Sequence, residues 1–256
     1  MIGIRLKTLI PALVLTVLAS PALADAIDGN WCHSDGRRFA IRGPEIVTPG
    51  GKHMEGNYSR HSFAYTAPAP RLALIDEQRM SEAQSTLMAA IRSGPRGNSI
   101  TPRGPFAVWL HAPEFGQLAQ AVGGFCRYQT SIPPRLSEFA ILCTARLWRA
   151  QYEWFAHAPI AEKAGVKPKT IADLRAGRVP KTAAKDERAV YDFIQEIYKT
   201  KRVSDRTYKR VHALFGDAGA VELVGILGYY VMISMTLNVF RMMPPADAEL
   251  AFAEPK

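Results

Sequence analysis

Residues 135–157 read RLSEFAILCTARLWRAQYEWFAH, and this stretch is long, largely apolar and free of glycine and proline. Two prolines at 133–134 precede it, and proline suits the first turn of a helix. Gly165 follows it and is a typical helix stop. We therefore expect one long helix from Arg135 to about Ala164.

Outward from this stretch, the chain after residue 71 keeps the residue spacing of helices. The clearest periodicity lies over residues 190–198, where apolar residues recur at i, i+3, i+4, i+7 and i+8, as on a helix with one buried face. Glycine and proline separate the other helical stretches. The sequence predicts an all-α fold with about seven helices, the others at about 72–91, 113–128, 169–176, 205–215 and 218–240.

The last of these helices, residues 218–240, holds a single acidic residue, Glu222, in an otherwise apolar run. A run of this length can cross a membrane, which is one interpretation. Gly225, Gly228 and the tyrosine pair at 229–230 instead favour a tightly packed helix inside the protein or at a subunit interface. We therefore expect no membrane insertion of the mature chain.

Residues 25–66 differ from the rest, because glycines, aromatic residues and alternating patterns are typical of short strands. Strands are expected at about 38–42, 45–48 and 61–66. So short a segment buries little surface, and we interpret it as an incomplete β-rich unit. Residues 67–70, APAP, follow as a stiff linker, and residues 71–256 are predicted to form the helical domain.

The first 24 residues have the features of a signal peptide. Arg5 and Lys7 form a positive start, residues 9–18 are apolar, and residues 22–24 give the small-x-small pattern of a cleavage site. The apolar stretch is shorter than the roughly 20 residues that a membrane-spanning helix needs. Cleavage after Ala24 and export to the periplasm or the medium are predicted.

The cysteines do not agree easily with export. Cys32, Cys126 and Cys143 are widely spaced, odd in number and include no C-x-x-C motif. No disulfide framework is predicted from them, and at least one thiol must stay unpaired in an oxidising compartment.

The overall composition describes a globular chain, with 48% hydrophobic residues and a net charge of +9. The 32 basic residues are not gathered in one run, so binding to nucleic acid is not expected. A basic surface attracts small anions. Histidines are scattered without metal-ligand spacing, so we expect no metal and no cofactor.

One pair of residues in the long stretch is suited to acid-base chemistry. Glu153 and His157 are four residues apart and share a helix face. The carboxylate can orient the imidazole and raise its pKa, as acid-base work near neutral pH requires. Such a pair is more often an exposed ion pair on a helix surface. Here the aromatic residues Tyr152, Trp154 and Phe155 flank it, which indicates a partly apolar boundary.

These residues also carry a resemblance to a known family. The stretch RLSEFAIL at 135–142, Ala145-Arg146 and QYEW at 151–154 with His157 resemble the carboxymuconolactone decarboxylase family, within the alkylhydroperoxidase D-like superfamily. The similarity covers about residues 71–240. It implies an all-helical bundle that assembles into trimers or hexamers, and a cytoplasmic location is then the alternative to export. Supporting motifs lie at 186–193, 203–205, 215–216, 221–224, 228–230 and 237–238.

The superfamily divides on one motif. Its peroxidase branch has a C-x-x-C pair followed four residues later by His, with a Glu upstream. In this chain the positions of the two thiols hold Ala150 and Glu153, while His157 and the upstream Glu138 are retained. Without a pair of thiols at this motif, the chain cannot reduce a peroxide by forming a disulfide there. Thiol-dependent antioxidant activity through Cys143 or Cys126 stays an alternative.

The decarboxylase branch needs no thiol, and the resemblance implies how roles are divided. His157 transfers the proton, Glu153 orients it and balances its charge, and Glu138 relays a second proton or positions water. Arginine matches a carboxylate with two parallel hydrogen bonds, so Arg146 and Arg149 are candidates for binding the carboxylate of a small anionic lactone-type substrate. The remaining candidates are Tyr152 and Trp154 as pocket wall and His111 as a further polar contact.

One geometric condition stays open. Glu138 and Glu153 are 15 residues apart, so on one straight helix they would lie roughly 22 Å apart and could not share a site. No proline or glycine between them announces a bend. A non-catalytic binding or assembly module on the same fold is therefore a further alternative.

Overall fold

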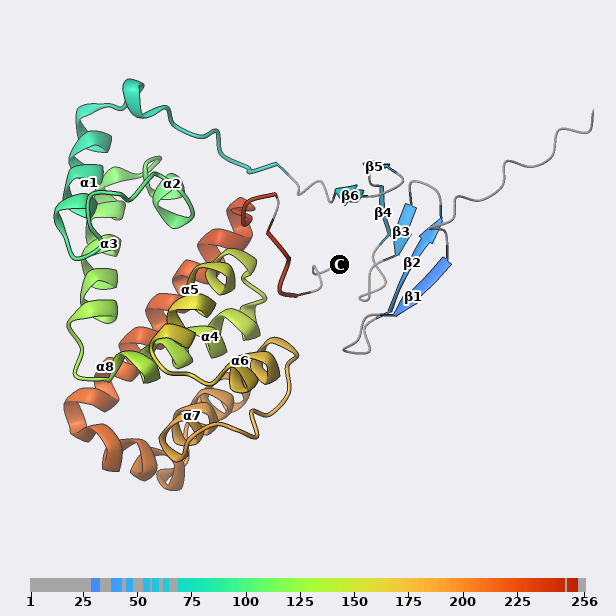
Figure 1. Cartoon of the computed structure of the whole chain (residues 1–256). Helices are drawn as coiled ribbons and strands as arrows, with labels where there is room; N and C mark the ends of the chain where they lie inside the picture. Colours follow the sequence, from blue (N-terminus) through green and yellow to red (C-terminus); the bar gives the residue numbers. More distant parts are fainter. Residues whose placement is uncertain are drawn as a thin grey trace, which may run out of the picture.

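The computed structural model describes residues 29–32, 38–42, 45–47, 53–55, 57–59, 62–64, 69–246 and 248–252. The predicted leader, residues 1–24, lies outside them. The predicted all-α fold is confirmed for the part from residue 69 onward (Figure 1). Its helices are the short 3-10 helix η1 (Glu77–Arg79) and α1 (Glu82–Ser93), α2 (Pro105–Trp109), α3 (Pro113–Tyr128), α4 (Pro134–Trp148), α5 (Gln151–Lys163), α6 (Pro168–Arg175), α7 (Lys185–Thr200) and α8 (Asp205–Phe240).

Short strands occupy the N-terminal segment, as its alternating pattern indicates. The first four form one antiparallel sheet in chain order, and the last two form a hairpin. The domain boundaries drawn from the sequence stay a prediction. The strands are β1 (Gly29–Cys32), β2 (Arg38–Arg42), β3 (Glu45–Val47), β4 (His53–Glu55), β5 (Asn57–Ser59) and β6 (Ser62–Ala64).

The core of the helical part is built around α4. Every residue from Leu136 to Ala145 is buried, because α5, α7 and α8 all pack against this helix. The long helix α8 also contacts α2 and α3, so it lies between those helices and the group α4–α7 (Figure 1). Because α4 is enclosed by other helices, it needs apolar residues on nearly all sides, which explains the largely apolar sequence of residues 136–145.

The single long helix expected over 135–164 is wrong, because the chain breaks after Trp148. Arg149 takes the left-handed conformation at φ 49° and ψ 38°, and α5 begins at Gln151. The amide of Ala150 donates to the carbonyl of Ala145 at 2.9 Å, which closes the last turn of α4. Glycine usually occupies such a position, and its absence is why the sequence gives no signal of the break.

Two other boundaries follow from local chemistry. The first helix starts at Glu82 rather than near residue 72, because the Ser81 side chain accepts a hydrogen bond from the Gln84 amide and the Gln84 side chain accepts one from the Ser81 amide. The predicted separation at Gly216 is confirmed as a non-helical residue inside α8, with φ 64° and ψ −167°. Only glycine adopts this conformation readily.

The apolar part of α8 meets the length and composition of a membrane span, and 44% of that window is buried inside the protein. Core helices of soluble proteins pass the same test. In this chain the buried residues of α8 face α4 and α7. One face of α8 therefore packs in the core, while Val221, Val224 and Met235 lie exposed on the same helix.

The break at Arg149 generates a stability prediction. Replacing Arg149 by Gly relieves the left-handed backbone at an exposed position, so we expect the free energy of unfolding to rise by about 1 kcal/mol. Urea denaturation measures this change. Arg149→Ala is the control, because it removes the same side chain without freeing the backbone. Equal stability of the two variants would contradict the argument.

Candidate active site

The break between α4 and α5 brings three charged side chains together. His157 Nδ1 lies 2.6 Å from Glu138 Oε2, although the two residues are 19 positions apart. On the other side of the ring, His157 Nε2 lies 3.1 Å from Glu153 Oε1, one helical turn earlier on α5. The imidazole of His157 is thus held between two carboxylates, and the open question of whether Glu138 reaches the Glu153–His157 pair is answered.

All three side chains are withdrawn from solvent, with relative exposures of 4% for Glu138, 3% for Glu153 and 5% for His157. Burial alone would lower the pKa of His157, but the negative charges of Glu153 and Glu138 outweigh it and raise that pKa to about 9. At neutral pH the site therefore holds a protonated imidazolium. The exposed ion pair considered for Glu153 and His157 is wrong, because both are buried.

The two contacts of His157 differ in quality. The contact with Glu138 is a hydrogen bond, whereas Glu153 Oε1 is a buried oxygen with no hydrogen-bond partner among the described residues. The ion pair with His157 therefore leaves that oxygen with unused accepting capacity.

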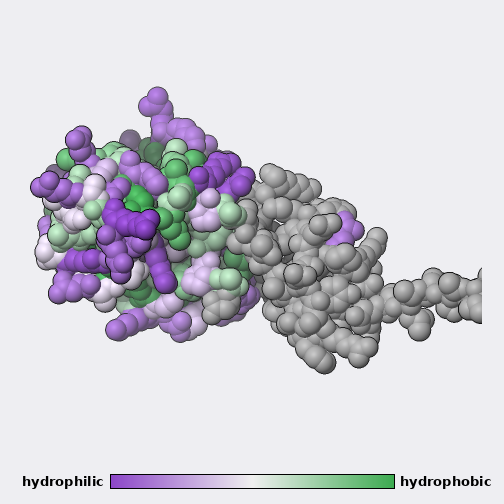
Figure 2. Space-filling model, turned by 90° about the horizontal axis from the view of Figure 1, so that it is seen from above, coloured by the Kyte–Doolittle hydropathy of each residue, from purple (hydrophilic) through white to green (hydrophobic). Residues whose placement is uncertain are grey.

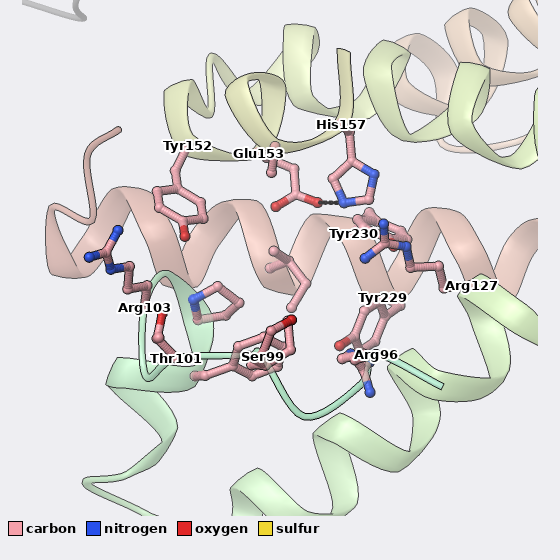
Figure 3. A pocket seen from close by; sticks show the side chains of 15 residues that line it. Arg96, Ser99, Thr101, Arg103, Arg127, Tyr152, Glu153, His157, Tyr229 and Tyr230 are labelled. Atoms are coloured by element: carbon pink, nitrogen blue, oxygen red, sulfur yellow. Dashed lines mark ion pairs between the residues drawn. The ribbon is translucent and has the colours of Figure 1, made fainter. Parts of the chain in front are cut away.

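A cavity of about 260 Å³ opens on this group, and Glu153 and His157 form one of its walls (Figure 3). Three arginines line the same cavity. Figure 3 shows Arg127 at the end of the cavity near His157 and Arg103 at the far end beside Tyr152. Arg96 lies across the cavity from His157. Arg127 also lies 3.7 Å from Glu138, so it links the cavity to the buried pair. The positive charge of the cavity suits an anion.

Two tyrosines of α8 complete the wall beside the imidazole. The ring of Tyr230 meets His157 edge-on at 5.3 Å, and Tyr229 packs against Tyr230 at 5.2 Å. Burial raises the pKa of both phenols, so both are neutral hydroxyls. Gly123 of α3 makes room for Tyr229, because a Cβ there would stand 1.9 Å from the phenol oxygen.

The substrate-binding residues suggested by the sequence are only partly brought together. Tyr152 lines the cavity. Arg146 lies elsewhere, with its Nε donating to the carbonyl of Arg175, and Arg149 ends α4 outside the cavity. Trp154 is buried against Phe252, and His111 Nε2 contacts the carbonyl of Ala73; neither lines the cavity.

Sequence reasoning missed most of the cavity lining. The missed group includes arginines from the loop after α1 and from α3, and tyrosines from α8, which contact each other only after folding. The tyrosine pair in an apolar helix was the one available signal, and it was read as packing. The missed polar residues are Arg96, Ser99, Thr101, Arg103, Arg127, Tyr229 and Tyr230.

The two described cysteine side chains take no part in this site. Cys126 and Cys143 are free and buried, and burial raises the pKa of both thiols. Cys143 borders a separate small cavity with Arg146. Within the described residues, no group of three His, Cys, Asp or Glu side chains is arranged to hold a metal ion.

Comparison with solved structures identifies the fold. The chain is similar to the crystal structure of an alkylhydroperoxidase AhpD core, an uncharacterized peroxidase-related protein from Ralstonia eutropha JMP134. The TM-score is 0.59 at 15% sequence identity, over 70% of this chain and 94% of the other. The fold is alkylhydroperoxidase D-like. No protein-family model and no curated protein sequence matches this chain.

The raised pKa of His157 generates a pH prediction. The folded protein binds this proton with a pKa of about 9, against about 6.5 in an unfolded chain. The stabilisation is complete below pH 6.5 and is lost as the pH rises through 9, by an amount on the order of 3 kcal/mol. Urea unfolding between pH 6 and pH 10 measures the loss.

The control for this prediction is His212→Gln, which removes an exposed histidine of α8 and should leave the pH dependence unchanged. Titration of the His157 ring by NMR gives a second readout that does not depend on unfolding. In Glu138→Gln, we expect the ring to titrate at lower pH. A ring that titrates near pH 6.5 in the wild-type protein would contradict the assignment.

Proposed function

We propose that the chain is a cofactor-free enzyme that protonates or decarboxylates a small carboxylated, lactone-type substrate. The observation that carries the proposal is the imidazole of His157, held between Glu138 and Glu153 at the wall of an arginine-lined cavity. The fold alone allows several activities. The proposal therefore rests on this arrangement.

The protonation state of His157 favours the role of an acid. An imidazolium with a pKa of about 9 carries a transferable proton at neutral pH. Glu138 holds the Nδ1 side of the ring at 2.6 Å, which fixes the ring so that Nε2 faces the cavity wall formed by Glu153. Both carboxylates stabilise the charge of the ring before the proton leaves.

The reaction that fits these groups begins with an anionic substrate. The bond between the carboxylate carbon and the ring carbon breaks, its electron pair moves into the conjugated carbonyl, and carbon dioxide leaves. The resulting enolate takes the proton from His157 Nε2, and the neutral imidazole regains a proton from water. The arginines stabilise the enolate oxygen and any second carboxylate, because their charges are fixed before the reaction starts.

The proposal favours this chemistry over thiol-dependent peroxide reduction for two reasons. Glu153 stands beside His157, at the position that holds a thiol in the peroxidase branch of the superfamily that the sequence resembles. Cys126 and Cys143 are buried, hold their protons tightly and do not line the cavity. A reactive cysteine needs an exposed thiolate.

The test is carbon dioxide release from a panel of carboxylated lactones and β-keto acids by the full chain. We expect His157→Gln to lower kcat by about 100-fold or more, the range for loss of a positioned proton donor. Glu153→Gln should lower kcat less, because the ring keeps its contact with Glu138. His212→Gln, on the exposed surface, is the matched control and should keep full activity.

Other outcomes select the alternatives. Peroxide consumption that disappears in Cys143→Ser would favour antioxidant activity and contradict the proposal. Ligand binding without turnover, unchanged in His157→Gln, would favour a binding module on the same fold.

The location of the protein is a second part of the proposal. Export rests on the composition of residues 1–24, which lie outside the described residues. The one described helix that is apolar and long enough for a membrane is α8, and its buried residues belong to the core. We therefore propose that the mature chain is exported and is not inserted in a membrane.

Assembly with further copies is a third part. Large hydrophobic side chains stay exposed between hydrophilic ones (Figure 2). On α3, Phe115, Leu118, Val122 and Phe125 follow one another at spacings of three and four and form one exposed face. We propose that this face contacts a second copy in a trimer or hexamer.

The mass of the protein in solution tests this assembly. We expect Leu118→Asp to lower the mass seen by sedimentation, because it places a charge in the face of α3. Val179→Asp makes the same change at an exposed loop residue and should leave the mass unchanged. A monomeric wild-type chain would contradict the proposal.

A further inference from the structure

A second cavity, of about 460 Å³, lies next to the first and shares Arg103 and Tyr152 with it. Two distant parts of the chain form its walls, namely residues 69–74 before α1 and residues 241–245 after α8. This second cavity is larger than the cavity at His157. The two cavities adjoin at the end where Figure 3 places Arg103 and Tyr152.

The lining of this second cavity is apolar. Leu74 and Phe155 lie in it with 69% and 43% of their surface exposed, and Met242 and Met243 stand beside them. Methionine side chains adapt to irregular ligands. Among the described residues that line it there is no aspartate or glutamate, and the charges present are those of arginines. The cavity therefore suits a hydrocarbon group attached to an anion.

Tyr152 divides the two cavities. Its ring lies against Gly104, where an added Cβ would stand 2.5 Å from the ring carbon. Gly104 has φ 57°, so glycine suits this position both by size and by backbone conformation. The ring therefore stands at the boundary, with the acid-base group on one side and the apolar residues on the other.

We propose that the second cavity binds the hydrocarbon tail of the substrate, and that the substrate is an amphipathic carboxylate. This inference rests on the proposed function, since it places the reactive anionic end at His157. Arg103 holds a negative group at the junction, and the tail passes Tyr152 to reach Leu74 and Met243. The continuity of the two cavities and the absence of carboxylates from the second support this occupant.

Binding of straight-chain carboxylates from butanoate to decanoate to the full chain, measured by calorimetry, tests the inference. Burial of each added methylene should strengthen binding about threefold until the cavity is full. Leu74→Asp should abolish this dependence on chain length, because it places a charge where the hydrocarbon tail would lie. Val179→Asp, the same change outside both cavities, should keep the dependence. Alkanols of equal length should bind more weakly, because they lack the negative charge that the arginines of the first cavity attract.

Two outcomes would overturn the inference. One is affinity that does not change with chain length in the wild-type chain, or that still rises in Leu74→Asp. The other is a lower sedimentation mass in Leu74→Asp, which would mean that a second copy covers this cavity. Neither outcome concerns the proposed function, which depends on carbon dioxide release and on His157. Conversely, a chain-length dependence without any turnover would support the second cavity and contradict the lyase.

Discussion

The site depends on one electrostatic constraint, the burial of a charged imidazole between two carboxylates. Removing the charged imidazole from water costs free energy, and the attraction of the two carboxylates offsets that cost. Two carboxylates on opposite nitrogens make the protonated ring the stable form and fix its orientation. The arrangement requires two helices to meet at a short break, and the left-handed residue Arg149 makes that break.

The helices could be predicted from the sequence because apolar periodicity and the glycines and prolines that end helices are local properties of the chain. The stripe over 190–198 lies on α7, and the helix predicted at 113–128 matches α3. The break at Arg149 could not be predicted, since it contradicts the preference of arginine and is stabilised by the packing of α4 and α5. Tertiary contacts decided that conformation against the local preference.

The candidate site shows the same division. Glu153 and His157 were predictable from their spacing on one helix, and Glu138 from the resemblance. The arginines of the cavity come from segments that meet only in the folded chain, so no spacing rule brings Arg96, Arg103 and Arg127 together. Arg146 and Arg149 were close to the pair in sequence, yet both side chains lie outside the cavity. Arg146 and Arg149 lie at the end of α4 and the pair lies on α5, so the break between the two helices separates residues that are close in sequence.

The burial of Cys126 and Cys143 determines how reactive their thiols are toward oxidants. A thiol attacks oxidants and disulfides as its thiolate, and burial raises the pKa of both thiols and so suppresses that form. These two residues therefore behave as small hydrophobic side chains rather than as redox groups. Two unpaired thiols of this kind stay reduced even in an oxidising medium, so the burial of Cys126 and Cys143 is compatible with the proposed export.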